Sequence, residues 1–348
     1  MSETTTERAR ASAPTLHDVA RAAGVSLATA SRVLNGSTRK VAETYRDRVE
    51  AAAAELGYTA NISAQATARG TSAIIALLVA DIADPYFGQI AAGVARGADE
   101  AGLVVTIAIT ERDPEREARL VRALRGQRPR GLILAASRTT ESSHPTVQAE
   151  LDALASTGGR VVALGPGAGA VRSVIIDNAS GARALGLVLA ERGYREAIVL
   201  AAGEGVLTSD DRTAGFTEGF AAKGGLVRRV YRGGFTRESG WQLMTQAIED
   251  GVAPGTLVFA ISDVVAIGAM SAVREAGRAV GSDIALCGFD DIPAGRDVTP
   301  ALTTVNIPLE EVGYRALRAA VDDDWDAGAE PLPLEVVLRE STPLAPSA

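Results

Sequence analysis

The chain has 348 residues, enough for two or three domains at roughly 150 residues each. Its 47% hydrophobic and 22% charged residues are typical of a globular protein rather than a disordered one. One cysteine, Cys287, and two histidines, His17 and His144, exclude internal disulfides, multi-cysteine metal sites and histidine-rich metal sites.

The net charge of −8 is unevenly distributed along the chain. Residues 1–69 hold nine Lys/Arg and seven Asp/Glu, a balance of +2, so the remainder carries −10. A small polyanion-binding module on an acidic body fits this distribution.

No apolar run reaches about 18 residues, and residues 1–14 lack the apolar segment of a secretory signal. We therefore expect a cytoplasmic protein that does not enter a membrane.

Apolar residues spaced by three and four predict three short helices near the amino end. They cover 15–23, 26–35 and about 44–56. Gly24 ends the first helix, and Val49, Ala52, Ala53 and Leu56 should face inward from the third. Two short helices joined at a glycine turn and braced by a third form a helix-turn-helix, whose second helix enters the major groove. A small bundle with solvated polar faces would show the same pattern, so the helix pattern alone leaves both open.

Four runs in this region carry a family resemblance: TLHDVA at 15–20, AGVS at 23–26, ATASRVLNG at 28–36 and ELGYTAN at 55–61. They resemble the head of the LacI/GalR (lactose-repressor) family of bacterial transcription regulators, and the resemblance extends from about 15 to 343. It implies a repressor that binds double-stranded operator DNA as a homodimer. It also implies control by a small-molecule effector, with a sugar as the commonest class.

The resemblance further implies which head residues meet DNA. The residues implied to contact the DNA backbone and position the head on it are Thr15, His17, Ser26, Thr29, Ser31, Asn35 and Tyr58. Those implied to contact bases are Leu27, Ala28 and Arg32. Arg39, in the loop 36–40, carries a charge suited to a phosphate. Packing against the third helix is the alternative role for His17 and Tyr58. Tyr45 departs from the Thr that most relatives have.

Residues 61–70 correspond to the family's hinge helix. A helix this short is unstable alone, because nucleation is costly and few hydrogen bonds follow. In the family it folds when two subunits pair over DNA, and Asn61, Ala64 and Gln65 match its contact positions. Thr67 stands where the family usually has Leu, so we expect weaker wedging of the minor groove. A flexible linker is the alternative.

From residue 73 strands and helices alternate. The expected strands cover 74–81, 103–110, 131–137, 160–165, 173–177, 197–202, 227–233, 257–261 and 284–289, and the expected helices 85–102, 113–127, 147–157, 180–192, 211–223, 237–249 and 264–275. Apolar strands alternating with helices predict parallel sheets covered on both faces. The predicted fold is therefore α/β: a three-helix helix-turn-helix head and hinge, then a two-lobed, periplasmic-binding-protein-like domain with doubly wound sheets.

We divide the chain accordingly. The predicted parts are a disordered tail at 1–14, a helix-turn-helix DNA-binding domain at 15–60, a hinge helix at 61–70 and an effector-binding domain at 71–348. Within that domain, lobe one covers about 71–172 and 304–332, and lobe two about 173–303 and 333–348.

Ligands of such sheets bind beyond the carboxyl ends of the strands. There the resemblance implies effector contacts from Tyr86, Phe87, Asp210, Arg212, Phe235, Ser262, Asp263 and Asp290. Aromatic faces suit the C–H face of a sugar or a planar base, and a carboxylate can accept two hydroxyl donors. Asp210 replaces an Arg of several sugar-binding members, and Ser262 replaces an Asn, so the pocket should differ from theirs.

Neither a Ser/His/Asp nor a Cys/His set stands at the spacing of a known catalytic family. The run Gly165–Gly169 does not fit a phosphate loop, since a strand rather than a helix follows it. We therefore expect that the protein is not an enzyme and that it holds neither a cofactor nor a metal ion. Two alternatives remain: a cytoplasmic sugar-binding or sugar-modifying protein with a helical oligomerisation head, and a ligand-independent DNA-binding protein, an activator included.

Overall fold

The structure is a computed structural model that describes residues 14–34, 41–59, 72–136, 145–167, 170–325 and 331–345. The chain forms two compact units, Met1–Ser72 and Ala73–Ala348, each with its own hydrophobic core. Several predicted site residues lie outside the described residues, namely Asn35, Arg39, Asn61, Ala64, Gln65 and Thr67.

The first unit contains α1 (Leu16–Ala22), α2 (Leu27–Leu34) and α3 (Glu43–Leu56). Helix α1 begins in a capping box: the Thr15 hydroxyl accepts the Asp18 N–H, and the Asp18 carboxylate accepts the Thr15 N–H. Gly24 turns the chain at φ 63°, a conformation that glycine adopts without a Cβ clash. The Ser26 hydroxyl accepts the Thr29 N–H at 3.1 Å and starts α2. The predicted three-helix head is confirmed.

Small residues make the core of this head. Its buried members are Val19, Ala20, Ala23, Ala30, Val49, Ala52 and Ala53. Leu56 was predicted to face inward and is 38% exposed, so that prediction was wrong. The reason is local: Leu56 is the last residue of α3, and Gly57 turns the chain away in a left-handed conformation at φ 62°.

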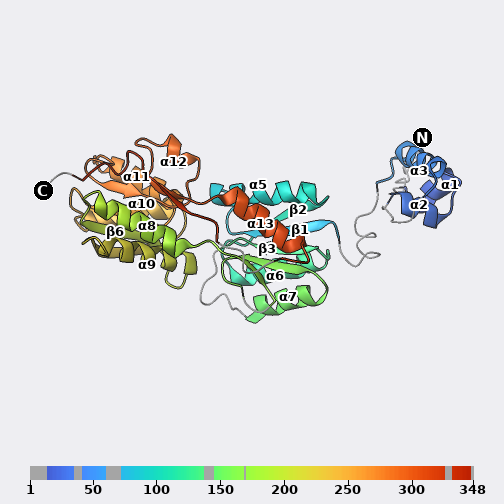
Figure 1. Ribbon diagram of the computed structural model, residues 1–348, viewed down its shortest axis with the longest axis horizontal. Coiled ribbons are helices and arrows are strands. Elements are labelled where there is room, and N and C mark those ends of the chain that lie inside the picture. The colour runs from blue at the N-terminus through green and yellow to red at the C-terminus, as the bar shows by residue number, and fades with distance from the viewer. Residues whose placement is uncertain are drawn as a thin grey trace, which may run out of the picture. The chain divides into compact units, whose positions relative to one another are not determined.

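The first lobe of the second unit contains a parallel sheet of order β2-β1-β3-β4-β5. Its strands are β1 (Ile74–Val79), β2 (Val104–Ile109), β3 (Gly131–Leu134), β4 (Arg160–Leu164) and β5 (Arg172–Val174). Helices α5 (Pro85–Glu100) and α13 (Leu309–Val321) cover one face, and α6 (Pro114–Arg125) and α7 (Pro145–Ser156) the other (Figure 1). Strand β1 is apolar throughout because Ile75 and Leu77 enter one core while Ala76 and Leu78 enter the other.

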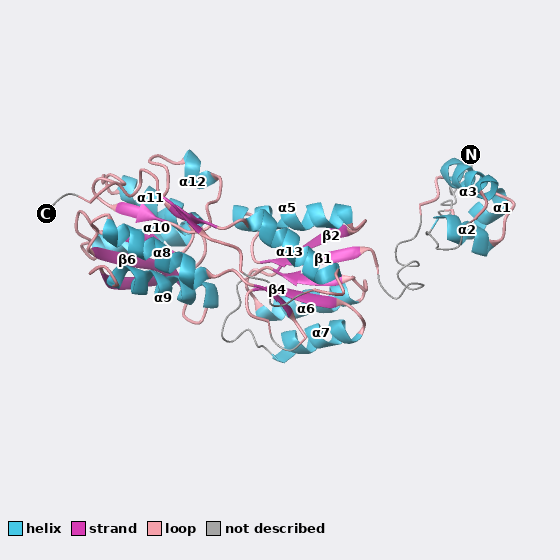
Figure 2. Cartoon of the chain, viewed as in Figure 1, coloured by secondary structure: helices cyan, strands magenta, loops and turns pink. Residues whose placement is uncertain are grey.

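The second lobe repeats this arrangement with the order β7-β6-β8-β9. Its strands are β6 (Glu196–Ala202), β7 (Leu226–Gly233), β8 (Leu257–Ala260) and β9 (Ala285–Cys287). Helices α8 (Asn178–Glu191) and α9 (Leu207–Ala221) pack on one face, and α10 (Arg237–Glu249) and α11 (Asp263–Glu275) on the other (Figure 2). A short helix, α12 (Ala294–Asp297), follows β9. Two doubly wound parallel sheets confirm the predicted fold class.

The lobes are joined by crossing segments of chain. Strand β5 leads from the first sheet into α8, and β10 (Thr304–Asn306) leads back into α13. The chain then returns through β11 (Glu335–Val337), which pairs antiparallel with β10. Beyond β11, the Leu286 N–H donates to the Ser341 carbonyl at 3.0 Å and ties the chain end to the second lobe.

Four elements were not among those predicted: α12, α13, β10 and β11. Helix α9 also begins at Leu207, four residues before its predicted start at 211. Polar residues at 208–210 resemble a loop, but the fully buried Ser209 hydroxyl accepts the Ala202 N–H at 2.9 Å, so its polarity is satisfied inside a helix. In the part of the chain that the structure describes, no helix is long and apolar enough to cross a membrane.

Candidate functional site

The outer face of α2 is the candidate nucleic-acid surface. Leu27, Ala28 and Arg32 are exposed, with Leu27 at 43%. Thr29 and Ser31 are half-buried beside them, and the Thr29 and Ser26 hydroxyls lie 2.8 Å apart. An apolar side chain, hydroxyls and a guanidinium are the groups that read thymine methyls and base edges in a major groove.

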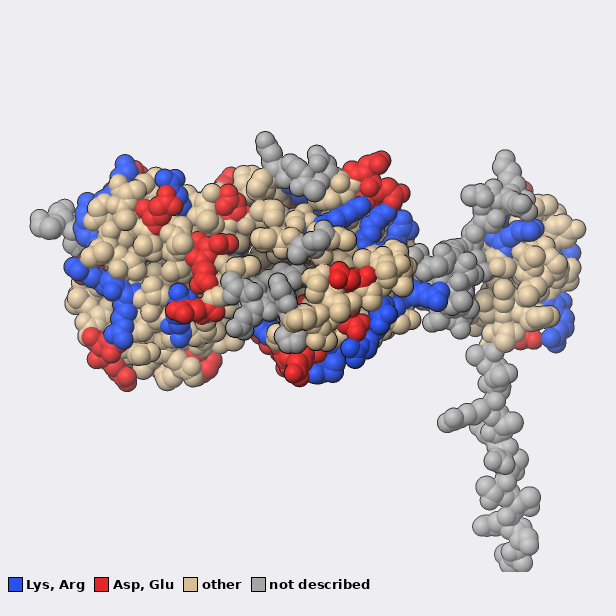
Figure 3. All heavy atoms as spheres, turned by 90° about the horizontal axis from the view of Figure 1, so that it is seen from below, with Lys and Arg blue, Asp and Glu red and all other residues tan. Residues whose placement is uncertain are grey.

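The charges and flanking residues of the head suit this surface. Arg21 pairs with Asp18 at 3.3 Å, whereas Arg32 forms no ion pair among the described residues. Figure 3 shows basic side chains on the visible face of the head. Thr15 and His17 are exposed, while Tyr58 is half-buried and packs against the head core, as the alternative role for Tyr58 requires.

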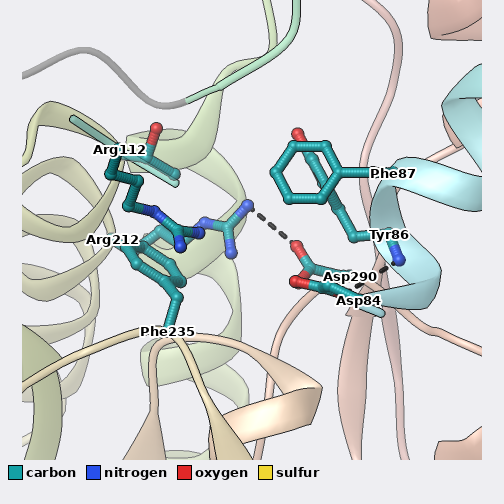
Figure 4. Close-up of a pocket in the computed structure, with 8 residues that line it drawn as sticks. Asp84, Tyr86, Phe87, Arg112, Arg212, Phe235 and Asp290 are labelled. Atoms are coloured by element: carbon teal, nitrogen blue, oxygen red, sulfur yellow. Dashed lines mark hydrogen bonds and ion pairs between the residues drawn. The ribbon is translucent and has the colours of Figure 1, made fainter. Parts of the chain in front are cut away.

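The second candidate site is a pocket between the two lobes of the second unit (Figure 4). It holds about 270 Å³, part of it open to solvent. Its lining residues follow strand ends: Asp84, Tyr86, Phe87 and Arg112 from the first lobe, and Thr208, Arg212, Phe235 and Asp290 from the second. This placement is the one that parallel sheets favour for ligands. A second hollow of about 480 Å³ adjoins it and shares Tyr86 and Thr208.

The amino end of α5 presents the aromatic wall of the pocket. Pro85 occupies the first turn, where its missing N–H costs nothing, and Asp84 caps the helix by accepting the Tyr86 N–H at 3.0 Å. This cap directs Tyr86 and Phe87 into the pocket, with their rings 5.0 Å apart at 89°. Burial raises the pKa of the Asp84 carboxyl, although its hydrogen bond from Tyr86 and the charge of Arg112 oppose the shift.

Arg212, on α9, is held at three points. Its Nε donates to Asn178 Oδ1 at 2.8 Å, its Nη1 donates to the Ile261 carbonyl at 2.7 Å, and its Nη2 lies 2.9 Å from Asp290 Oδ1. The guanidinium also stacks 4.0 Å from the centre of the Phe289 ring. These contacts join α8, the residue that follows β8 and the loop after β9, so Arg212 braces the second lobe while facing the pocket.

Asp290 is the acceptor at the centre of the pocket. Its φ of 114° is rare for a residue with a side chain, which marks a backbone position held by its surroundings. Burial raises the pKa of Asp290 to about 7, and Arg212 opposes the shift. The Oδ1 atom is buried and paired with Arg212 but accepts no well-aligned hydrogen bond from the described residues, so it retains the capacity to accept a further donor.

Arg112 enters the pocket from the loop that follows β2. Its guanidinium carbon lies 4.9 Å from the centre of the Phe235 ring, across the space between the lobes. Burial lowers the pKa of Arg112, and the negative charges of Asp84 and Asp81 partly offset this effect. Its buried Nε has no hydrogen-bond partner among the described residues.

The structure thus brings five of the predicted effector residues into one pocket: Tyr86, Phe87, Arg212, Phe235 and Asp290. It does not line the pocket with the other three. Asp210 instead accepts the Gly205 N–H at 2.9 Å and pairs with Arg232 at 3.2 Å, within the second lobe.

Ser262 and Asp263 are also turned away from the pocket. The Ser262 hydroxyl caps α11 by accepting the Val265 N–H. Asp263 is fully buried, where it accepts the Thr304 hydroxyl at 2.6 Å and the Ile292 N–H at 2.9 Å. Both side chains are needed to begin α11 and to hold β10 beside the second lobe, so neither projects beyond the sheet.

Three lining residues were not among the predicted contacts: Asp84, Arg112 and Thr208. Asp84 and Thr208 lie beyond the carboxyl ends of β1 and β6, where the strand-end rule places ligand contacts. Arg112 follows the carboxyl end of β2, and the same rule applied to that strand would have selected it. In the described ranges no group of three or more His, Cys, Asp or Glu could hold a metal ion.

Comparisons with known proteins match two parts of the chain to known families. Residues 15–61 match the family described as bacterial regulatory proteins, lacI family, and residues 188–342 match the periplasmic binding protein-like domain. The ribose operon repressor of Halalkalibacterium halodurans is 31% identical over 334 residues, covering 94% of this chain and 97% of that protein.

Two solved structures are also similar. A lac repressor dimer bound to operator and the anti-inducer ONPF superposes with a TM-score of 0.81 at 27% identity, covering 95% of this chain and 99% of that one. A complex of the transcriptional regulator CelR with cellobiose superposes with a TM-score of 0.65 at 31% identity, covering 94% and 99%.

Proposed function

Because this chain belongs to the LacI family of bacterial regulatory proteins, we propose that it represses transcription by binding operator DNA, under the control of a sugar bound between its lobes. The observation that carries the proposal is the pocket itself. Buried carboxylates and aromatic rings from both lobes converge on one space, in a chain that also has a helix-turn-helix head. Hydroxyl acceptors beside aromatic faces are the chemistry that recognises a sugar.

The DNA-binding half of the proposal rests on α2. In a homodimer, two such helices would read the two halves of a pseudo-palindromic operator in successive major grooves. Leu27, Ala28 and Arg32 are the proposed base readers, and Thr15, His17, Ser26, Thr29 and Ser31 the proposed backbone contacts. The lac repressor structure, a dimer on its operator, supports this arrangement.

The effector half of the proposal rests on the two lobes. A sugar that donates hydroxyls to Asp290 and packs on Tyr86 would contact both lobes at once, and would so favour one relative position of the lobes. An effector can shift the equilibrium only by its difference in affinity for the two states. A shift from 1:99 to 99:1 needs roughly 5.5 kcal/mol of differential binding. The CelR–cellobiose complex and the ribose operon repressor support a sugar.

We retain the domain boundaries of the sequence analysis as part of this proposal. Residues 15–60 would bind DNA, 61–70 would form the hinge helix, and 71–348 would bind the effector. The role is one of binding rather than catalysis, since the relatives are transcriptional regulators.

The test is operator selection from a random duplex library at defined salt, followed by measurement of affinity with and without sugars. We expect Arg32→Ala to weaken binding by about 1–3 kcal/mol and to relax selection at one base position. Arg119→Ala is the matched control, because Arg119 is 63% exposed on α6 of the first lobe and should leave operator affinity unchanged.

The alternatives predict different results. A sugar-binding protein with an oligomerisation head would select no DNA sequence, and Arg32→Ala would leave its weak DNA affinity unaltered. A ligand-independent DNA binder would select an operator that no sugar affects. Either result would overturn the proposal.

A further inference from the structure

Arg112 stands apart from the other charged residues that line the pocket. Arg212 has each of its three donor positions engaged, by Asn178, Ile261 and Asp290. The Arg112 guanidinium, by contrast, makes no hydrogen bond or ion pair with any residue in the described ranges, and its Nε is buried. Arg112 is half-buried, and its buried Nε–H lacks an acceptor while no described residue pairs with its Nη groups, so this geometry favours an acceptor from outside the chain.

The backbone holds Arg112 in this position at a conformational cost. Glu111 and Arg112 both adopt positive φ, 55° and 57°, in a turn without glycine. The turn is held because the Glu111 N–H donates to the Ala80 carbonyl at 3.1 Å and the Arg112 N–H donates to the Thr110 hydroxyl at 3.4 Å. Such conformations persist where the surrounding structure holds them, and they cluster at functional sites. Here the turn aims a long side chain across the pocket, as Figure 4 shows.

The pocket's own carboxylates do not supply the missing acceptor. Asp290 Oδ1 is paired with Arg212, and Asp84 Oδ1 caps α5. Neither carboxylate is within hydrogen-bond distance of Arg112, and they act on it only as nearby charges. The Phe235 ring also carries the Arg112 guanidinium on one face, so Tyr86 and Phe87 remain the aromatic surface for a sugar ring.

We propose that the effector is an acidic sugar, whose carboxylate or phosphate group is held by Arg112 while its hydroxyls reach Asp290. This inference rests on the proposed function and names the ligand class of the same pocket. A guanidinium fork matches the paired oxygens of a carboxylate or phosphate, and an anion also compensates the half-buried positive charge of Arg112, which a hydroxyl does not. Arg112 is thus the specificity-determining residue for acidic over neutral sugars.

The test compares sugars that share one carbon skeleton. Full-length protein is titrated by calorimetry, at one low ionic strength, with galactose, galacturonate and galactose 6-phosphate, and with the corresponding glucose series. The variants are Arg112→Gln, which removes the charge, and Arg112→Lys, which keeps it without the fork. Arg119→Gln is the control, since Arg119 is exposed and lies outside the pocket.

We expect at least one acidic sugar to bind tenfold or more tightly than its neutral counterpart in the wild-type protein. Arg112→Gln should abolish that preference, Arg112→Lys should retain part of it, and Arg119→Gln all of it. The carboxylate and phosphate arms show which anion the pocket takes. Because the preference is measured first in the wild-type protein, a poorly folded variant leaves the test valid.

Two results would overturn the inference, and they differ in whether the proposed control of DNA binding by a sugar is also overturned. If neutral sugars bind as tightly as their acidic counterparts and shift operator affinity, acidic specificity is wrong and sugar control stands. If no sugar of either class binds while the operator is still selected, sugar control is wrong as well.

Discussion

The guanidinium of Arg212 lies 2.9 Å from the carboxylate of Asp290, and both side chains are almost completely buried, at 2% and 5% exposed. The pair connects α9 to the loop after β9 and faces the space between the lobes. Burying two charges is costly, so such a pair adds little stability over an apolar replacement of the whole pair. The pair instead fixes the position of the Asp290 carboxylate in the lining of the pocket.

Breaking this pair should nevertheless destabilise the protein strongly. We expect Arg212→Met to lower the free energy of unfolding by about 3–5 kcal/mol, because it leaves Asp290 buried without its partner. Arg183→Met is the matched control: Arg183 pairs with Glu218 at 2.7 Å with both side chains more than half exposed, so its loss should cost about 1 kcal/mol or less. Urea denaturation measures both. An equal loss of free energy of unfolding in the two variants would contradict the interpretation of Arg212 and Asp290 as a buried ion pair.

The raised pKa of Asp290 makes stability depend on pH. An unfolded aspartate has a pKa of about 3.9, whereas burial raises the pKa of folded Asp290 to about 7. The folded state therefore binds the Asp290 proton more tightly than the unfolded state does. The stability that protonated Asp290 contributes is complete below about pH 4 and is lost as the pH rises to about 7.

Asp290→Asn isolates this effect, because Asn does not titrate. We expect the free energy of unfolding of the wild-type protein, relative to Asp290→Asn, to fall between about pH 4 and pH 7, by at most about 1.4 kcal/mol per pH unit. Urea denaturation of the two proteins in parallel buffers measures it. A difference that stays constant over this range would show that Asp290 does not titrate there.

Two glycines of α5 should respond in opposite directions to the same substitution. A Cβ at Gly93 would lie 1.8 Å from the Glu310 carbonyl oxygen of α13, so we expect Gly93→Ala to destabilise the protein by about 1–3 kcal/mol. A Cβ at Gly88 would meet no described atom within 4 Å, so Gly88→Ala should stabilise it by about 0.5–1 kcal/mol. Thermal denaturation distinguishes them. A similar change in both would mean that α5 and α13 do not pack closely.

The capping box of α1 should control the stability of the head. We expect Thr15→Ala to cost about 1 kcal/mol, because the Asp18 N–H loses its acceptor. Hydrogen bonds from Thr15 lower the pKa of Asp18 in the folded state. The stability that the Asp18 carboxylate contributes is therefore present above its unfolded pKa and is lost as the pH falls through its folded pKa. Amide hydrogen exchange of α1 measures both effects. Thr44→Ala, on the exposed side of α3, is the control and should leave exchange unaltered.

Local patterns predicted the elements well where one residue decides an end. Helix α10 has the predicted bounds because Thr236 caps it by accepting the Ser239 N–H at 3.0 Å. Helix α13 was overlooked although Leu309, Val312, Ala316 and Ala320 follow a helical spacing and are buried. The spacing of these residues is therefore sufficient to predict α13 from the sequence.

The amino-acid sequence by itself determined the head, the alternation of strands and helices and the family, because caps, periodicity and motifs are local properties. Only the tertiary structure decided which strand ends meet. Ser262 and Asp263 follow β8 as predicted, yet they are needed to cap α11 and bind Thr304, while Arg112 crosses from the other lobe to Phe235. The Ser262 cap is local, but the Asp263–Thr304 hydrogen bond joins residues 41 positions apart, and the Arg112–Phe235 contact joins residues more than a hundred positions apart. These two long-range contacts depend on the order of the strands in the sheets and on how the lobes are connected. No short stretch of sequence encodes either property.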